Sequence, residues 1–316
     1  MADLNSTGKE QSNKVLIKVA FVGMFACYLF AVFGVTLLNR SPGDTGLFRL
    51  MPFYSYIEAW YQYEDEDWSN LILNIFMLVP FGLLLPYLHK KFRNFAPTLL
   101  AGLLFIICIE TTQFILKRGI LETDDLINNT LGTVIGYAFF RLADYLHKRI
   151  QKETVPLKPV LLYQLPLVIT TIAFITIFGI HGLKELGNLS CHYITRAHPE
   201  SVTCNTEFDS QSNMVYVYAV PEDSPRHTKG DITDPNTDLK DATPYKEVPI
   251  ITEEEAYTRI AQGFFRFEPA YEPENIIVND IFLAYEVDSK GFYQPIYILE
   301  CHIDGEDTRL YTPAIR

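Results

Sequence analysis

The stretch Ala96–Leu116, APTLLAGLLFIICIETTQFIL, decides the fold class of this 316-residue chain. It is apolar over most of its length, and Glu110 is its one charged residue. A helix of about 20 mostly apolar residues crosses the hydrocarbon core of a bilayer. Similar segments occur at Val19–Leu38, Trp68–Leu88, Leu126–Leu146 and Pro159–Ile180. The sequence therefore predicts an α-helical polytopic membrane bundle with five transmembrane helices, the alternative being a soluble bundle of buried helices.

The charges between these segments predict their direction. Basic residues precede the first segment, lie between the second and third, and follow the fourth: Lys9, Lys14, Lys18, Lys90, Lys91, Arg93, Lys148, Arg149, Lys152 and Lys158. The alternate connections carry the acidic runs 64–67 and 122–125. Basic loops stay in the cytoplasm. We therefore expect the N-terminus inside and the C-terminus outside the cell.

The formal net charge of −12 is unevenly distributed. Residues 1–181 hold 15 basic and 14 acidic residues, and residues 182–316 hold 11 and 24. This excludes a uniform soluble acidic domain. An apolar content of 48% and an aromatic content of 14% exclude a disordered chain. The acidic balance also disfavours a nucleic-acid partner, which would attract basic patches.

The organisation along the chain follows from these patterns. In the C-terminal part, Thr252–Glu255 has capping-box spacing, and the runs 276–287 and 292–303 predict two strands around the turn at 288–291. A third strand is expected at 309–315. We predict a cytoplasmic N-terminus at 1–18, a four-helix membrane domain at 19–147, a cytoplasmic linker and fifth helix at 148–181, an irregular extracellular region at 182–250, and a small extracellular α+β domain at 251–316.

The segment Arg49–Tyr63 is rich in tyrosine and holds Trp60. Amphipathic aromatic side chains favour the boundary between membrane and water. We interpret the segment as interfacial or re-entrant, lying over the outer face, and simple anchoring is the plainer alternative.

Polar side chains inside the predicted spans indicate where a function could lie. A charge at bilayer depth costs roughly 2.5 kcal/mol or more, so it usually faces a partner or a cavity. Glu110 and Gln113 share one helical face, and Asn74 and Glu110 both lie about 9 Å below the outer end. The sequence predicts an outward-facing polar pocket, with Arg118 as the counter-ion. Its residues, here called the polar cluster, are Asn74, Glu110, Gln113, Arg118, Asp125 and Asn129.

The alternative to a pocket is a hydrogen-bond network that holds the helices together. Asp125, Asn129, Gly132 and Gly136 form one stripe on a helix, and Gly132-x-x-x-Gly136 is a close-packing motif. This alternative and the pocket both stay open.

Catalytic and metal motifs are scarce. The chain shows no nucleophile–base set, no phosphate-binding glycine loop and no His/Cys metal spacing, so we expect no metal and no cofactor. Glu110 and Asp125 are the one candidate acid/base pair. Cys27 and Cys108 lie in apolar stretches and are expected to be buried, and a Cys191–Cys204 disulfide stays open.

Several of these motifs together resemble the VanZ family. They are Asn74-Ile-Phe-Met-Leu-Val-Pro80-Phe-Gly82, Ile109-Glu110-Thr-Thr-Gln113, Arg118, Asp124-Asp125-Leu-Ile-Asn-Asn129-Thr-Leu-Gly132-Thr-Val-Ile-Gly136, and Arg49-Leu-Met-Pro52-Phe53. The resemblance covers about residues 20–147. It implies a small multi-pass membrane protein of Gram-positive type bacteria, and the family's founding member is linked to resistance to teicoplanin, a glycopeptide.

Two positions depart from the family pattern. The family often has Asn where this chain has Arg49, and Asp where it has Glu122. Structural roles are expected for Pro52, Phe53, Pro80, Gly82, Gly132 and Gly136, with Pro80 bending its helix. The acidic tail is an addition to the family.

Three functions are consistent with these features. The first is a non-enzymatic envelope protein whose pocket binds a membrane lipid, a lipid-linked cell-wall precursor or a lipoglycopeptide, and so changes sensitivity to glycopeptides. The second is an enzyme acting on a lipid-linked substrate, with Glu110 as acid or base. The third is a membrane-tethered regulatory protein acting through its acidic domain.

Overall fold

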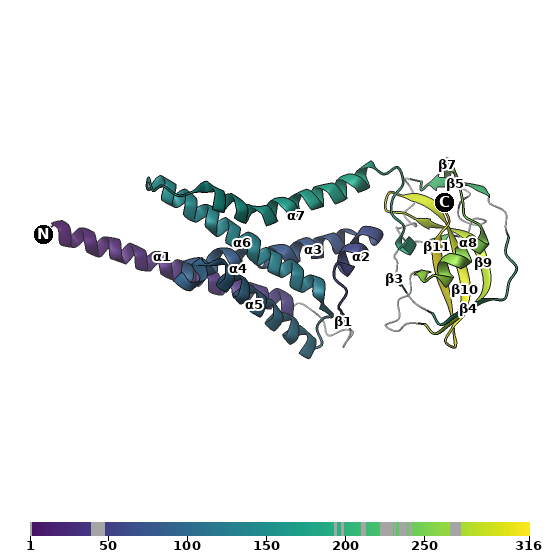
Figure 1. Cartoon of the computed structure of the whole chain (residues 1–316), viewed down its shortest axis with the longest axis horizontal. Helices are drawn as coiled ribbons and strands as arrows, with labels where there is room; N and C mark the ends of the chain where they lie inside the picture. Colours follow the sequence, from purple (N-terminus) through teal and green to yellow (C-terminus); the bar gives the residue numbers. More distant parts are fainter. Residues whose placement is uncertain are drawn as a thin grey trace. The chain divides into compact units, whose positions relative to one another are not determined.

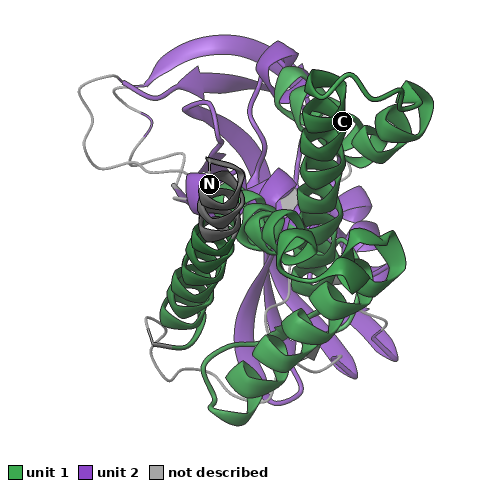
Figure 2. Cartoon of the chain, turned by 90° about the vertical axis from the view of Figure 1, so that its left-hand side faces the viewer, with its two compact units in different colours: residues 1–55, 68–179 green, residues 56–67, 180–316 purple. Residues whose placement is uncertain are grey.

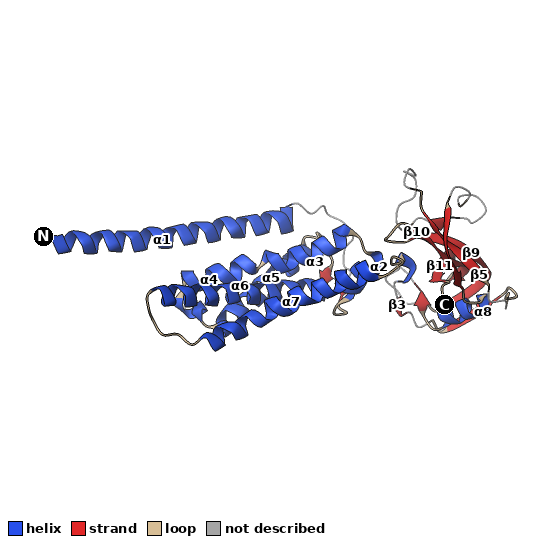
Figure 3. Cartoon of the chain, turned by 90° about the horizontal axis from the view of Figure 1, so that it is seen from above, coloured by secondary structure: helices blue, strands red, loops and turns tan. Residues whose placement is uncertain are grey.

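The computed structural model describes residues 2–38, 48–192, 195–196, 199–209, 213–221, 230, 232–233, 239, 242–265 and 273–316 (Figure 1). The chain divides into two compact units (Figure 2). Unit 1 comprises residues 1–55 and 68–179, and unit 2 comprises residues 56–67 and 180–316. Long helices build unit 1, and nearly all strands lie in unit 2 (Figure 3).

The helices of the first part of the chain are α1 (Ala2–Phe33), the π-helical turn η1 (Gly34–Leu38), α2 (Tyr54–Gln62), α3 (Asp65–Met77), α4 (Val79–Leu88), the 3-10 turn η2 (Lys90–Arg93), α5 (Phe95–Ile115), α6 (Thr123–Ile150) and α7 (Leu157–Leu183). In the described residues, four regions are long and apolar enough to cross a membrane: Lys18–Leu37, Asp65–Leu88, Phe95–Ile115 and Leu157–Leu183. Their outward faces carry exposed apolar side chains such as Leu73, Phe76 and Leu104. The protein is therefore a multi-pass membrane protein.

The predicted span Leu126–Leu146 is helical but is not one of these four regions. It lies within α6, which carries Asp124, Asp125, Arg141 and Asp144. Buried side chains are more numerous on α6 than on any other helix of unit 1. Neighbouring helices thus surround α6, and polar residues can find partners there. Five spans and their inside–outside direction stay predictions.

Glycines bring α6 into contact with its neighbours. A Cβ added to Gly132 would overlap the carbonyl oxygen of Ile75 on α3, and one added to Gly136 would overlap that of Val79 on α4. A Cβ added to Gly82 on α4 would overlap the carbonyl oxygen of Thr133. Close backbone approach of this kind is how membrane helices gain packing energy. The stripe that begins at Asp125 therefore faces α3 and α4.

The second predicted span consists of two helices. α3 ends at Met77 and α4 begins at Val79, with Pro80 in its first turn. Proline has no N–H to donate, and the first turn of a helix needs no such donor, so Pro80 fits the start of α4. The Tyr28 hydroxyl on α1 donates a hydrogen bond to Met77 O at 2.8 Å, which supports this break.

Unit 2 contains a seven-stranded sheet in the order β4-β9-β10-β5-β7, with β11 paired to β10 and β6 to β9. The strands are β4 (Ser201–Cys204), β5 (Met214–Ala219), β6 (Ile232–Thr233), β7 (Thr243–Pro249), β9 (Asn275–Val287), β10 (Phe292–Ile303) and β11 (Glu306–Pro313). The short strands β3 (Thr195–Arg196) and β8 (Phe264–Phe265) pair with each other. The turn η3 covers Ser190–His192. The two predicted strands and the strand after them are confirmed.

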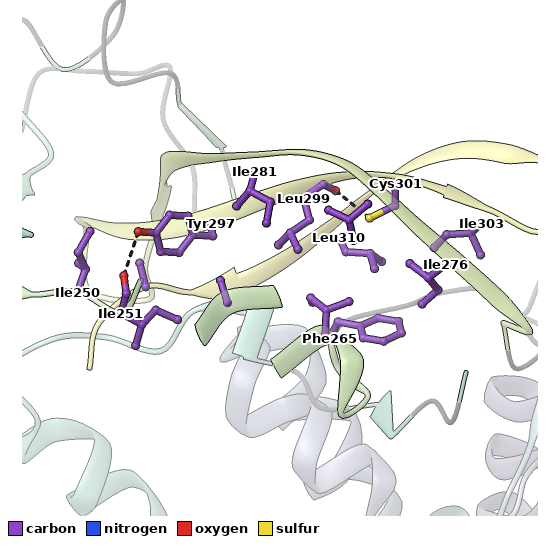
Figure 4. Packing of buried hydrophobic residues seen from close by; sticks show 14 residues of the cluster. Ile250, Ile251, Phe265, Ile276, Ile281, Tyr297, Leu299, Cys301, Ile303 and Leu310 are labelled. Atoms are coloured by element: carbon purple, nitrogen blue, oxygen red, sulfur yellow. Dashed lines mark hydrogen bonds between the residues drawn. The ribbon is translucent and has the colours of Figure 1, made fainter. Parts of the chain in front are cut away.

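The helix α8 (Glu253–Ala261) covers the core of this sheet, as Figure 4 shows from close by. It begins with the predicted capping box: Thr252 accepts from Glu255 N, and the Glu255 carboxylate accepts from Thr252 N. Tyr297 donates to Ile251 O at 2.9 Å within the core (Figure 4). Burial raises the pKa of the Cys301 thiol to about 12, so this thiol stays protonated at neutral pH and is a poor nucleophile.

The region 182–250, expected to be irregular, contributes β4, β5 and β7 to the sheet. β7 holds Pro244, Lys246, Glu247 and Pro249, and Val248 is its one buried residue. Apolar and polar residues do not alternate along β7 with the two-residue period of a strand. Its strand conformation comes from pairing with β5, which is a contact distant in sequence.

The cysteines differ from expectation. Cys191 lies in a hydrophobic cluster with Leu189, Ile296 and Ile298, whereas Cys204 packs against the main core of unit 2, and the two form no disulfide. Cys27 and Cys108 are exposed on the surfaces of their helices, since apolar faces of a membrane bundle point outward.

The aromatic segment at the end of α2 packs against residues 181–188. The Tyr63 ring stacks on His181 with 3.4 Å between ring centroids. The Asn188 side-chain amide donates to Trp60 O at 2.5 Å, and Lys184 lies over the Trp60 ring. Part of the segment predicted to lie at the membrane interface therefore contacts protein. Its partners are the last turns of α7 and the chain that follows α7.

Candidate functional site

The polar cluster lies at one end of α3, α5 and α6. Glu110 is 7% exposed, Gln113 is 3% and Asn129 is 1%. Asn74, Arg118 and Asp125 are partly buried. Gln113 lies in the last turn of α5, and Asp125 in the first turn of α6. The helix ends thus bring together residues that are up to 55 positions apart, from Asn74 to Asn129.

Asn74, Asp125 and Asn129 form one connected group between α3 and α6. The Asn74 amide donates to the Asp125 carboxylate at 2.5 Å. The Asn129 amide donates to the backbone oxygen of Asp125 at 2.8 Å, and Thr133 donates to Asn129 O at 3.3 Å. A charge-assisted bond such as Asn74 to Asp125 is stronger than one between neutral groups. It holds the carboxylate against α3.

Gln113 and Arg118 face the end of α1 instead. The Gln113 amide donates to Thr36 O at 2.9 Å, and the Arg118 guanidinium donates to Leu37 O. Both acceptors lie in the π-helical turn η1, where wider winding changes the usual helix hydrogen bonds. These two contacts tie α5 to α1.

The ion pair expected for Arg118 is not found in the described residues: it forms no salt bridge to Glu110 or Asp125 there. Its described contact is with a backbone oxygen at the end of α1. The last carbonyl groups of a helix have no partner within the helix and carry partial negative charge. A guanidinium is stabilised by bonding to them, which explains why Arg118 contacts Leu37 O.

Asp124 is a site residue that the sequence analysis passed over. It is 2% exposed, and its two carboxylate oxygens accept from Phe53 N at 2.6 Å and Ser55 N at 2.7 Å. Phe53 has a φ of +65°, which turns its N–H toward the carboxylate. Asp124 thereby caps the start of α2. The sequence held a clue to this role. Two adjacent aspartates on one helix point in different directions, so Asp124 needs a partner other than α3 if Asp125 faces α3.

A short parallel pair of strands joins the same two loops. β1 (Phe48–Arg49) pairs with β2 (Leu121–Glu122), and Arg49 stands opposite Glu122. Their side chains form a salt bridge of 3.3 Å, and Ser55 donates to Glu122 at 3.0 Å. The loop before α2 is therefore held to the loop before α6 by the backbone and by two carboxylates.

The polar cluster includes two acceptor atoms for which the described part of the chain provides no hydrogen-bond partner. They are Oε1 of Gln113 and Oδ1 of Asn129, and both atoms are buried. Buried polar atoms of native proteins are nearly always bonded, so each exception calls for an explanation. No group of three or more metal-ligating side chains occurs among the described residues.

Comparison with known proteins places this cluster within one domain. Residues 17–144 match the family model described as VanZ/LLP1. Residues 17–144 therefore resemble the VanZ/LLP1 family. The matched range holds every residue of the polar cluster together with Asp124. It ends before α7 and before residues 180–316, which form most of unit 2.

A curated relative of this domain is Protein VanZ of Enterococcus faecium. It is 28% identical over 134 residues, which is 40% of this chain and 77% of the relative. No solved structure matches the chain. Arg49 and Glu122, the two positions at which the resemblance implied a departure from the VanZ pattern, contact each other through a salt bridge.

Proposed function

We propose that the VanZ/LLP1 domain acts in the cell envelope, where its polar cluster binds a lipid head group or a lipid-linked cell-wall precursor. Binding of this kind would lower the sensitivity of the cell to glycopeptide antibiotics such as teicoplanin. The observation that carries the proposal is the pair of buried acceptor atoms on Gln113 and Asn129, both inside the matched domain. Helix-to-helix bonding alone leaves these atoms unexplained.

The connections between helices are consistent with a site that opens at one end of the bundle. The polar side chains lie near the loops 48–55 and 116–124, and not at the helix ends near 88–95. Asp124 and Glu122 hold those loops in place next to the cluster. A rigid rim of this kind presents a site with little loss of entropy on binding.

The first prediction concerns drug susceptibility. Cells that produce Asn129→Leu or Glu110→Gln are expected to lose most of the protection against teicoplanin, with a change of about tenfold in binding if one buried hydrogen bond is lost. Minimal inhibitory concentration and drug binding are measured at equal protein abundance. Thr111→Val is the matched control, since Thr111 is exposed on the same helix.

Equal susceptibility of all three variants and wild type would refute the proposal. Mass spectrometry of the extracted lipids accompanies the assay. Lipids chemically changed by wild type but not by Glu110→Gln would identify an enzyme instead.

The proposal also places the N-terminus inside and unit 2 outside the cell, from the basic loops described above. Alkaline phosphatase, which is active only outside the cytoplasm, is fused after Arg316 in one strain and after Lys152 in another. We expect activity from the first fusion and none from the second. The reverse pattern would invert the orientation, and activity in both would exclude it.

A further inference from the structure

The chemistry of the ligand can be read from the direction of the amide groups in the polar cluster, provided that the proposed function holds. Three side-chain amides there donate to the protein itself. Asn74 donates to the Asp125 carboxylate, Asn129 to Asp125 O, and Gln113 to Thr36 O. The Arg118 guanidinium likewise donates to Leu37 O. At least one N–H of each of these groups is therefore directed to a partner within the bundle.

These partners determine which end of each amide is the nitrogen. A backbone carbonyl only accepts hydrogen bonds, so the atom of Gln113 that contacts Thr36 O must be the NH₂ group. The same holds for Asn129 against Asp125 O. Exchanging oxygen and nitrogen would set two acceptors against each other.

The oxygen atoms of the Gln113 and Asn129 amides are then the atoms that lack a partner among the described residues. Oε1 of Gln113 and Oδ1 of Asn129 are buried and have no partner, in side chains that are 3% and 1% exposed. An acceptor is satisfied only by a group that carries a proton. A phosphate diester has oxygens and no such proton, so it would repel these atoms.

We propose that the ligand of this site presents hydrogen-bond donors, either hydroxyl or ammonium groups, to Gln113 and Asn129, and that a bare phosphate group is rejected. The ligand class is thus a glycosylated or aminated lipid head group. The hydroxyl groups of a sugar and the ammonium of an aminolipid share this chemistry.

Binding of four short-chain lipids to the purified full chain tests the proposal. Dioctanoyl phosphatidylethanolamine and phosphatidylcholine differ in their N–H donors. The second pair consists of a dioctanoyl diglucosyl lipid, whose sugars carry hydroxyl donors, and dioctanoyl phosphatidylmethanol, whose phosphodiester head group has no donor. We expect each donor lipid to bind about tenfold more tightly than its partner, the effect of one buried hydrogen bond. If the preference within the first pair is stronger, the donor is an ammonium group. If the preference within the second pair is stronger, the donor is a sugar hydroxyl.

Two variants connect the preference to the named atoms. Asn129→Leu and Gln113→Met keep the approximate volume and remove the acceptor, so each should reduce the preference to within about threefold, while Thr111→Val keeps it. Thermal unfolding confirms that the variants fold. Equal binding of donor and donor-free lipids by wild type overturns the inference and leaves the proposed function standing. Absence of binding by all four lipids overturns the inference, and the susceptibility assay described above then decides the proposed function separately.

Discussion

Replacing Gly132 with alanine is expected to destabilise the helical bundle by about 2–3 kcal/mol, the upper range for overpacking a tight interface. The added Cβ would overlap the backbone oxygen of Ile75, and a backbone atom cannot rotate away as a side chain does. α6 would have to move from α3, which would also stretch the bond from Asn74 to Asp125. Unfolding in a denaturing detergent, followed by circular dichroism, measures the loss.

The matched control for this prediction is Gly23→Ala. Gly23 lies in helix α1, and a Cβ added there meets nothing within 4 Å. Alanine has the higher helix propensity, so Gly23→Ala should stabilise slightly or change nothing. Equal stability of Gly132→Ala and wild type would mean that α3 and α6 are not in backbone contact.

Replacing Asp124 with alanine is expected to release the start of α2 from the bundle. The carboxylate is 2% exposed and accepts two backbone N–H groups, at Phe53 and Ser55. Hydrogen bonds to a charged group contribute roughly 1.5–3 kcal/mol each, so protection of these amides should fall by at least about tenfold to a hundredfold. Hydrogen exchange measured by mass spectrometry over residues 53–62 reports the change.

Glu66→Ala is the control for Asp124→Ala. Glu66 is exposed in the first turn of α3, and its replacement also removes one negative charge. It should leave exchange in 53–62 unchanged. Loss of protection throughout unit 1 in Asp124→Ala would show that the carboxylate holds the whole bundle together. Unchanged protection would show that the cap contributes nothing.

The predictions from sequence succeeded where the signal is local and strong. Apolar length identified the four regions that are long and apolar enough to cross a membrane, and the capping box at Thr252 marked the start of α8. The turn at 288–291 correctly placed the hairpin of β9 and β10. In each case a few neighbouring residues specify the element, because helix capping and turn geometry are set within one turn of chain.

The predictions failed where the partner is distant in sequence. β7 has no strand pattern of its own, and it exists because β5 supplies the hydrogen bonds. Arg118 seemed a counter-ion for a carboxylate, yet it bonds to Leu37 O. The sequence assigned Asp125 to the polar cluster and gave Asp124 no role. In the structure Asp124 accepts a hydrogen bond from Phe53 N, just before α2, while Asp125 accepts one from Asn74.

The sequence by itself determined that this protein is a membrane bundle with an acidic C-terminal part, because hydropathy and charge are sums over local residues. Its motifs added a resemblance to the VanZ family. It also placed the polar residues near one end of the helices. Only the tertiary structure decided which atoms of those residues are already bonded and which, on Gln113 and Asn129, are left over. That distinction depends on the direction of each of the two side-chain amides, and packing between helices sets this direction, whereas residue type does not.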